Sequence, residues 1–361
     1  MGGDRRADRN AISETLASEM PQNLLSCRSQ HRKRGSWKMH RAWRRPNSLL
    51  ERLENLNPFA PVCVFLVLLC CCLLLVTAAG CSCVTDGAMQ SLTHHGSLKA
   101  VLPPSSEYEL VSLRTKDGTK IVAQFGRARD RNGALLADYG LRPTVVYCYP
   151  GGGTMRWSAP QFEGFRRLGL NVIMPEYPGY GMSDGQASES GFYAAAEAAY
   201  DYVLGRTDLD HTRIFAAGWS LGGSAAVDLS SRRQTAGLVI VGTSTTFRDL
   251  RRYYAAGHPL ISWLAGRVLA RIASMVQLDS LAKIPSVRCP ILLVSATQDQ
   301  LVSKEMTDRL AAAARTKMTL LRVDGAGHYD IFRVGGAGLW RTIGDWIVTT
   351  DSTGPGTRTS L

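Results

Sequence analysis

Residues 213–223 read Arg-Ile-Phe-Ala-Ala-Gly-Trp-Ser-Leu-Gly-Gly and pass directly into the helix-forming stretch Ser-Ala-Ala-Val-Asp-Leu. An apolar run that ends in Gly-x-Ser-x-Gly and continues into a helix predicts a strand, a tight turn and a helix. Such a strained turn lifts the serine hydroxyl above the sheet. Glycines are needed on either side because a Cβ there would collide with the neighbouring strand and helix. Ser220 is therefore the predicted nucleophile.

A second copy of the pattern lies at residues 181–185, which read Gly-Met-Ser-Asp-Gly. This copy follows Pro-Gly-Tyr-Gly and leads into the polar residues Gln-Ala-Ser-Glu. Glycine, proline and polar residues in this order are typical of a loop and do not indicate a strand followed by a helix. We therefore expect Ser183 to be a turn residue.

The order of apolar runs predicts the fold class. Residues 109–113 and 120–125 flank the turn signal Lys-Asp-Gly-Thr and indicate a hairpin. Strands that lack polar alternation are buried on both faces, as in parallel sheets covered by helices. Runs of this kind lie at 144–149, 171–174, 213–217, 238–241 and 291–294, and helical stretches lie at 190–204, 221–231, 304–314 and 338–348. Their alternation predicts an α/β fold with a mostly parallel, doubly wound sheet.

This pattern sets the expected domain limits. We assign one α/β domain to residues 108–350, with a small helical lid at about 246–285 that carries Phe247, Tyr253, Tyr254 and Trp263. Residues 81–107 contain Gly, Ser, Thr and a Pro-Pro pair, which is typical of a tether. Residues 351–361 are expected to form a disordered tail.

The N-terminal part of the chain predicts a membrane association. Residues 1–60 are expected to form a basic, disordered segment. They contain twelve Lys and Arg but only six Asp and Glu, so they carry half of the chain's net charge of +12. Residues 61–80 are apolar and uncharged, and about 18–20 such residues span a bilayer core. The basic flank places residues 1–58 in the cytoplasm and the catalytic domain on the extracytoplasmic side. We expect no nucleic-acid binding, because no zinc-finger, RNP or helix-turn-helix signature is present.

Three interpretations of the apolar segment remain open. Small residues before Cys81 resemble a bacterial lipoprotein signal, in which the cysteine is lipidated and the preceding segment is removed. A retained signal-anchor is the second interpretation, and an ordinary cleaved signal peptide is the third. The first two give a membrane-tethered protein.

Two further residues complete a catalytic pattern with Ser220. A serine hydroxyl needs a base to accept its proton, and the base needs an orienting acid. Asp299 lies just past the end of a buried strand, and His328 lies in a glycine-rich loop after another strand. The chain order Ser, Asp, His is the one found with a strand–turn–helix nucleophile. Asp324 and Asp330 are rival acids, but neither lies at the end of the penultimate strand.

Backbone amides are the predicted donors to an oxyanion. One is the N–H of Leu221, directly after the nucleophile, and the other is the N–H of Gly152 in the loop after the first parallel strand. No cluster has metal-ligand spacing, so we expect no metal ion. No organic cofactor is indicated either.

Three segments carry a resemblance to a known family. These are Glu-Tyr-Pro-Gly-Tyr-Gly-Met-Ser-Asp-Gly at 176–185, Gly-Trp-Ser-Leu-Gly-Gly at 218–223 and the run from Asp279 to Val294. From about residue 108 to 350 the chain resembles the α/β-hydrolase superfamily, and within it the membrane-tethered ABHD/Bem46-like group. The resemblance implies hydrolysis of an ester, thioester or related acyl bond, often in a lipidic substrate.

The sequence therefore predicts a membrane-tethered serine hydrolase that uses a Ser-His-Asp triad and an acyl-enzyme intermediate. Its expected partners are the membrane and a small-molecule, lipid or acylated substrate. Two alternatives remain open, namely a serine aminopeptidase and a catalytically silent binding protein on the same fold. The sequence does not indicate an oligomeric state.

Overall fold

The strands of one sheet organise the part of the chain that the computed structural model describes, residues 102–103, 105–257 and 277–352. The strand order is β1-β2-β4-β3-β5-β6-β7-β8. β1 pairs antiparallel with β2, and β2 pairs antiparallel with β4, whereas all other neighbours are parallel. The strands span Glu109–Arg114 (β1), Lys120–Gly126 (β2), Thr144–Cys148 (β3), Asn171–Pro175 (β4), Ile214–Trp219 (β5), Gly237–Val241 (β6), Ile291–Ala296 (β7) and Met318–Val323 (β8).

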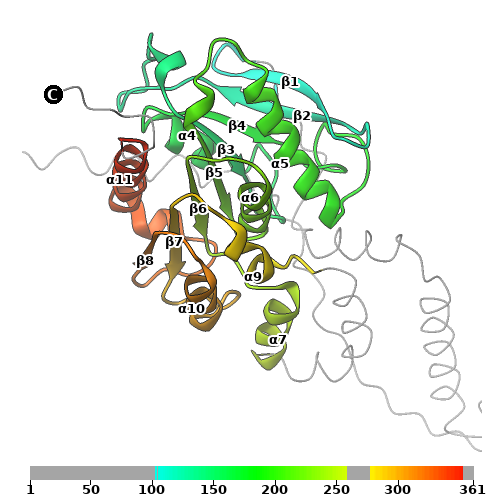
Figure 1. Ribbon diagram of the computed structural model, residues 1–361, viewed down its shortest axis with the longest axis vertical. Coiled ribbons are helices and arrows are strands. Elements are labelled where there is room, and N and C mark those ends of the chain that lie inside the picture. Colours follow the sequence, from blue (N-terminus) through cyan, green and yellow to red (C-terminus); the bar gives the residue numbers. More distant parts are fainter. Residues whose placement is uncertain (1–101, 104, 258–276, 353–361) are drawn as a thin grey trace, which may run out of the picture. The chain divides into compact units, whose positions relative to one another are not determined.

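Helices cover both faces of this sheet (Figure 1). α5 and α6 pack together over β3 to β6, and α11 packs over β6, β7 and β8 and contacts α4. The helices span Ala159–Arg166 (α4), Glu189–Leu204 (α5), Leu221–Arg232 (α6), Phe247–Gly257 (α7), Ser280–Lys283 (α9), Lys304–Ala313 (α10) and Ile331–Ser352 (α11). Short 3-10 turns span Tyr139–Leu141, His211–Arg213 and Ile284–Ser286. The mostly parallel α/β sheet predicted from the sequence is confirmed.

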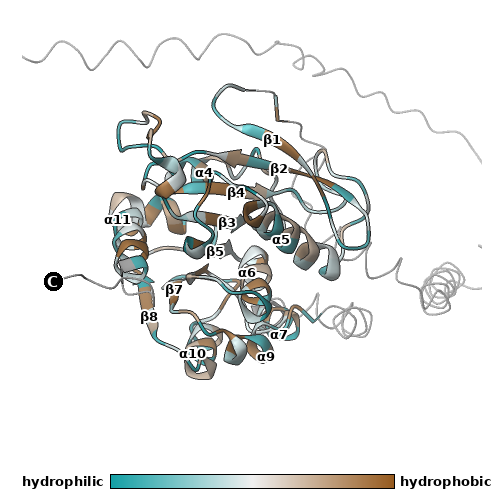
Figure 2. Cartoon of the chain, turned by 45° about the horizontal axis from the view of Figure 1, so that its top comes forward, coloured by the Kyte–Doolittle hydropathy of each residue, from teal (hydrophilic) through white to brown (hydrophobic). Residues whose placement is uncertain are grey.

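The core lies along the central strands. Every residue of β3, β4, β5, β6 and β7 is buried, as expected for strands covered on both faces. Figure 2 shows the hydrophobic character of these strands, for example in β3. The edge strand β8 is only partly buried, because no further strand pairs with it. Parallel central strands bring their carboxyl ends to one edge, where open α/β sheets bind ligands.

Parts of several predicted segments lie outside the described residues. Of the lid expected at 246–285, α7 and α9 are described and residues 258–276 are not. The basic segment at 1–60, the apolar segment at 61–80 and most of the tether at 81–107 are also outside, as are residues 353–361. In the ranges that are described, no helix is both long enough and apolar enough to cross a membrane.

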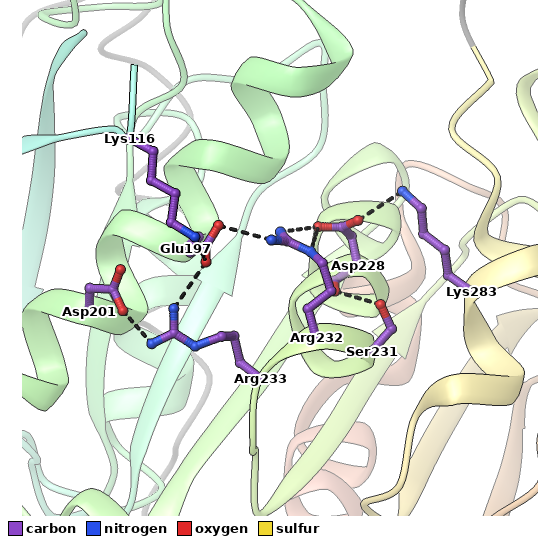
Figure 3. Close-up of polar contacts among 8 residues, drawn as sticks. All are labelled: Lys116, Glu197, Asp201, Asp228, Ser231, Arg232, Arg233 and Lys283. Carbon is purple, nitrogen blue, oxygen red and sulfur yellow. Dashed lines mark hydrogen bonds and ion pairs between the residues drawn. The ribbon is translucent and has the colours of Figure 1, made fainter. Parts of the chain in front are cut away.

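A buried acidic side chain ties α5 to its neighbours. Glu197 on α5 is 5% exposed, and its carboxylate lies among three cations (Figure 3). The oxygens lie 2.6 Å from Lys116 Nζ, 2.9 Å from Arg232 and 3.0 Å from Arg233. Burial raises the pKa of Glu197, but the hydrogen bonds from Lys116 and Arg232 outweigh it and lower the pKa from 4.5 to about 2.

The same ionic cluster continues from α6 to α9. Asp228 on α6 accepts from Arg232 Nε at 3.0 Å and lies 2.9 Å from Lys283 Nζ on α9 (Figure 3). The Lys283 ammonium also lies 3.6 Å from the centre of the Tyr193 ring on α5. These contacts bind α5, α6 and α9 together.

We expect Glu197→Gln to destabilise the protein in a pH-dependent way. In the folded protein the pKa of Glu197 lies below 4.5, the ordinary value of a glutamate side chain. The ion pairs therefore stabilise the fold fully above about pH 5. Their contribution to the free energy of unfolding is lost as the pH falls from about 4.5 towards 2. The shift corresponds to at most about 3 kcal/mol. Urea unfolding of the full chain, followed by tryptophan fluorescence, should show a wild-type advantage at pH 7 that shrinks steadily below pH 4.5.

Glu305→Gln is the matched control, because Glu305 is exposed on α10. We expect this change to alter the free energy of unfolding by less than about 0.5 kcal/mol. An equal loss in the two variants, or a Glu197→Gln loss that does not vary with pH, would contradict a stabilising role for the buried ion pairs.

Candidate active site

Ser220 occupies the turn between β5 and α6, where the sequence predicts it. Its backbone angles are φ 56° and ψ −120°, a conformation that non-glycine residues rarely adopt. Such strain costs about 1–3 kcal/mol and is characteristic of functional sites. Backbone hydrogen bonds hold it in place, since Ser220 N–H donates to Val241 O at 2.8 Å and Gly223 N–H donates to Ser220 O at 3.0 Å.

Glycines on both sides of Ser220 allow the backbones to approach. A Cβ at Gly218 would overlap the Gly222 carbonyl, and a Cβ at Gly222 would overlap the Cys148 carbonyl at the end of β3. The first turn of α6 therefore packs directly against the strand that leads into the predicted oxyanion loop. The steric reason given for these glycines from the sequence is confirmed.

Three residues far apart in the chain form a hydrogen-bonded row. His328 Nε2 lies 2.9 Å from Ser220 Oγ, and His328 Nδ1 lies 2.8 Å from Asp299 Oδ2. Asp299 and His328 are 8% and 7% exposed, so their hydrogen bond is shielded from bulk water, whereas Ser220 is partly exposed. The loops after β5, β7 and β8 supply one residue each, which places all three at the carboxyl edge of the sheet.

The surroundings of Asp299 decide the histidine tautomer. Asp299 Oδ1 accepts from the N–H groups of Leu301 and Val302, each at 2.8 Å, which leaves Oδ2 facing the imidazole. A carboxylate only accepts hydrogen bonds, so the proton lies on His328 Nδ1. Nε2 is then the acceptor of the Ser220 hydroxyl proton, which is the arrangement that a general base requires.

The rival acids have other partners. Asp324 accepts from Thr297 Oγ1 at 3.1 Å, and Asp330 accepts from Gly327 N–H at 2.8 Å and pairs with Arg333. The first bond joins the loop after β8 to the end of β7, and the second stays within the loop after β8. The structure therefore places Asp299, and neither rival, against the imidazole.

Ser183 is buried and has a structural role. Its hydroxyl accepts from Val122 N–H at 3.0 Å and donates to the Glu176 carbonyl at 3.1 Å. These bonds connect β2 to the loop after β4. The expectation that the second Gly-x-Ser-x-Gly is a turn is confirmed.

The two predicted oxyanion donors lie on elements that meet at the site. Leu221 is the first residue of α6, where helix amides have no partner within the helix. Gly152 is exposed in the loop after β3, whereas its neighbours Gly151 and Gly153 are buried. Gly153 N–H donates to Pro150 O at 2.9 Å, so that amide closes a turn within the loop.

Aromatic residues that the sequence did not single out surround the row. Trp157, which is 51% exposed, stacks on Trp219 with ring centres 5.5 Å apart. Tyr329 is 64% exposed, and its ring lies 5.2 Å from the His328 ring. Of the predicted lid aromatics, Tyr253 donates its hydroxyl to the Asp299 carbonyl at 3.3 Å. No sequence pattern marks Trp157 or Tyr329, because they flank the site only after folding.

Within residues 102–103, 105–257 and 277–352, no group of three or more His, Cys, Asp or Glu side chains is placed to hold a metal ion.

Comparison with known proteins identifies the class to which this fold and site belong. The sequence profile of the alpha/beta hydrolase family matches residues 145–334, which is 190 of the 361 residues. The chain therefore belongs to the alpha/beta hydrolase family. The matched region contains Ser220, Asp299 and His328.

Relatives agree with this assignment. The chain is 34% identical over 191 residues to an uncharacterized protein of Mycobacterium tuberculosis, in a match that covers 53% of this chain and 64% of the relative. It is 25% identical to the protein Bem46 of Schizosaccharomyces pombe, with 69% of this chain and 79% of Bem46 covered. The resemblance to Bem46-like α/β-hydrolases is confirmed.

A solved structure has the same fold. An esterase of Pyrococcus furiosus superposes with a TM-score of 0.56 over 71% of this chain and 99% of its own length, at 18% sequence identity. Identity at this level supports the shared fold alone. The fold of this chain is therefore shared with an esterase of known structure.

Proposed function

We propose that this α/β-hydrolase is a serine hydrolase that cleaves an ester, thioester or related acyl bond through an acyl-enzyme intermediate. The observation that carries the proposal is the hydrogen-bonded row Ser220–His328–Asp299 on a strained turn. Its geometry supports a nucleophile, a general base and an orienting acid in those positions.

The proposed reaction proceeds in two halves. Ser220 Oγ attacks the acyl carbonyl while its proton passes to His328 Nε2, and the N–H groups of Leu221 and Gly152 donate to the developing oxyanion. The imidazolium then protonates the departing alcohol or thiol, which leaves the acyl group on Ser220. Water attacks the acyl-enzyme with His328 again as the base, and the carboxylic acid departs as Ser220 regains its proton. Asp299 keeps the imidazole oriented throughout.

The contacts of Asp249 bear on the aminopeptidase alternative. A preference for a substrate with a terminal amine needs an available carboxylate near the lid, and Asp249 in the first turn of α7 is a carboxylate of that segment. Its carboxylate lies 2.7 Å from Arg309 and accepts from Thr245 Oγ1 at 2.6 Å. Because these partners engage Asp249, acyl esters are favoured over aminoacyl amides.

A substrate panel separates the three readings. We would assay the purified full chain on short- and long-chain p-nitrophenyl esters, acyl thioesters and aminoacyl p-nitroanilides. The proposal expects turnover of esters or thioesters in the wild type and none above background in Ser220→Ala. Preferential turnover of aminoacyl anilides would favour the aminopeptidase, and a folded chain inert on every substrate would favour a binding protein.

We also propose that the apolar segment at 61–80 tethers this domain to a membrane, with a lipidic or acylated substrate on the extracytoplasmic side. The support is the length of the uncharged run and the basic flank that precedes it. Alkaline carbonate extraction of cells that express the full chain tests the tether. Recovery of the chain in the soluble fraction would contradict it.

A further inference from the structure

The loop after β3, which carries Gly152, is held from one side by the loop after β4. The Tyr180 hydroxyl donates to the Gly151 carbonyl at 2.9 Å. At the far end of the same loop, Met155 N–H donates to Glu176 Oε1 at 3.3 Å. Tyr180 and Glu176 are both 0% exposed, so water does not compete for either contact.

The Tyr180 ring is itself fixed by packing. It lies in a buried aromatic cluster, and its ring centre is 5.6 to 6.4 Å from those of Tyr149, Tyr177 and Phe192. Aromatic rings packed at such separations and angles leave little freedom for rotation. The hydroxyl is therefore presented to the Gly151 carbonyl from a rigid position.

The carbonyl of Gly151 and the N–H of Gly152 belong to one peptide unit. The described chain contains no cis peptide bond, and a planar trans unit points its C=O and N–H in opposite directions. A hydrogen bond that fixes the Gly151 carbonyl therefore also fixes the direction of the Gly152 N–H. Glycines on both sides of this peptide would otherwise let it rotate, because glycine adopts many backbone conformations at low cost.

We propose that Tyr180 is a positioning residue that aims the Gly152 N–H at the substrate oxyanion. The inference rests on the proposed function and deepens it. Tyr180 does not touch the reacting atoms and acts only through the peptide between Gly151 and Gly152. The Gly-Gly-Gly loop is too flexible to fix the direction of this peptide by itself, and the hydrogen bond from the Tyr180 hydroxyl fixes it instead.

Tyr180→Phe tests the inference, because it removes the hydroxyl and keeps the ring packing. Deleting a whole oxyanion donor lowers kcat by about 10²–10³-fold, and a misaimed donor retains part of its effect, so we expect a fall in kcat of roughly 10-fold. KM for p-nitrophenyl butyrate should change by less than about 2-fold, since the oxyanion forms only in the transition state. The Ki of an alkyl trifluoromethyl ketone, which forms a tetrahedral adduct, should rise by the same factor as kcat/KM falls.

Tyr177→Phe is the matched control. The Tyr177 hydroxyl donates to the Tyr149 carbonyl at 2.6 Å, and this buried bond also reaches the loop after β3. That carbonyl belongs to the peptide before Pro150, which has no N–H to aim. The control should lower the melting temperature about as much as Tyr180→Phe does, while kcat and the ketone Ki stay within about 2-fold of wild type.

The outcomes distinguish the inference from the function on which it rests. Unchanged kcat and Ki in Tyr180→Phe, or equal losses of kcat in the two variants, would overturn the positioning role while Ser220-dependent turnover stands. Wild-type turnover that persists in Ser220→Ala, or no turnover of the ester by the folded wild type, would overturn the proposed function and the inference with it.

Discussion

Ser220→Ala is expected to abolish hydrolysis of acyl esters, with a loss in kcat of about 10⁶-fold by analogy with other serine hydrolases. The alanine lacks the oxygen that attacks the carbonyl, which in the wild type lies 2.9 Å from His328 Nε2. Ester turnover measured at saturating substrate, with the melting temperature as a check on folding, tests this expectation. Residual turnover within about 10-fold of wild type would exclude Ser220 as the nucleophile.

Ser183→Ala is the matched control for this loss, since Ser183 lies in the second copy of the same motif. Its hydroxyl accepts from Val122 N–H and donates to the Glu176 carbonyl, and the variant loses both hydrogen bonds. We expect a loss of stability of about 1–3 kcal/mol from these buried groups, with kcat retained at a temperature where the variant is folded. The two serines thus separate a loss of chemistry from a loss of stability.

Asp299→Asn is expected to lower kcat by about 10³–10⁴-fold while leaving the fold intact. The amide oxygen can still accept from Leu301 and Val302 N–H, as Oδ1 does now. The amide nitrogen then faces His328 Nδ1, at present 2.8 Å from Oδ2, and donates to it. The proton moves to Nε2, which can no longer accept the proton of Ser220.

Asp324→Asn is the control for this tautomer argument. Asp324 is exposed and accepts from Thr297, and it does not contact the imidazole. We expect its kcat to lie within about 2-fold of wild type, as for most surface substitutions. Equal losses from the two substitutions would contradict the assignment of Asp299 as the orienting acid.

The sequence predicted the sheet well because its signals were local. Buried strands such as β3 and β7 are short apolar runs bounded by turn residues, and they can be recognised without knowing their neighbours. The α5, α6 and α10 helices were predicted to within one or two residues at each end. The positions of Ser220 and Asp299 were predicted because each follows such a strand, and that of His328 because it lies in a glycine-rich loop after a strand.

Elements that depend on tertiary contacts were missed. α4, at Ala159–Arg166, contains Gly164, at which a Cβ would overlap the Trp340 ring of α11. Its glycine reads as a helix breaker in the sequence, but close packing against another helix requires it. In α11 only residues 338–348 were predicted, because Gly335 and Gly336 interrupt the pattern. Gly336 has φ 48°, and the helix continues on both sides of it.

The hydrogen bonds that hold the loop after β3 beside the candidate site could not be predicted from the sequence either. The motif around Tyr180 was recognised as part of a family resemblance, but nothing local indicates that its hydroxyl reaches Gly151. The two residues are 29 positions apart and meet because β3 and β4 are neighbours in the sheet. Strand order could have suggested that their loops adjoin, but the hydrogen bond depends on how the aromatic cluster packs.

The most direct test of the central claim is to locate the adduct that a fluorophosphonate forms with the native full-length chain. Trypsin places Ser220 in the peptide 214–232 and Ser183 in the peptide 168–206, so mass spectrometry can separate the two serines. We expect one stoichiometric adduct on Ser220 in the wild type, and its loss in Ser220→Ala but not in Ser183→Ala. An adduct on peptide 168–206, or none on a chain that hydrolyses esters, would contradict the account.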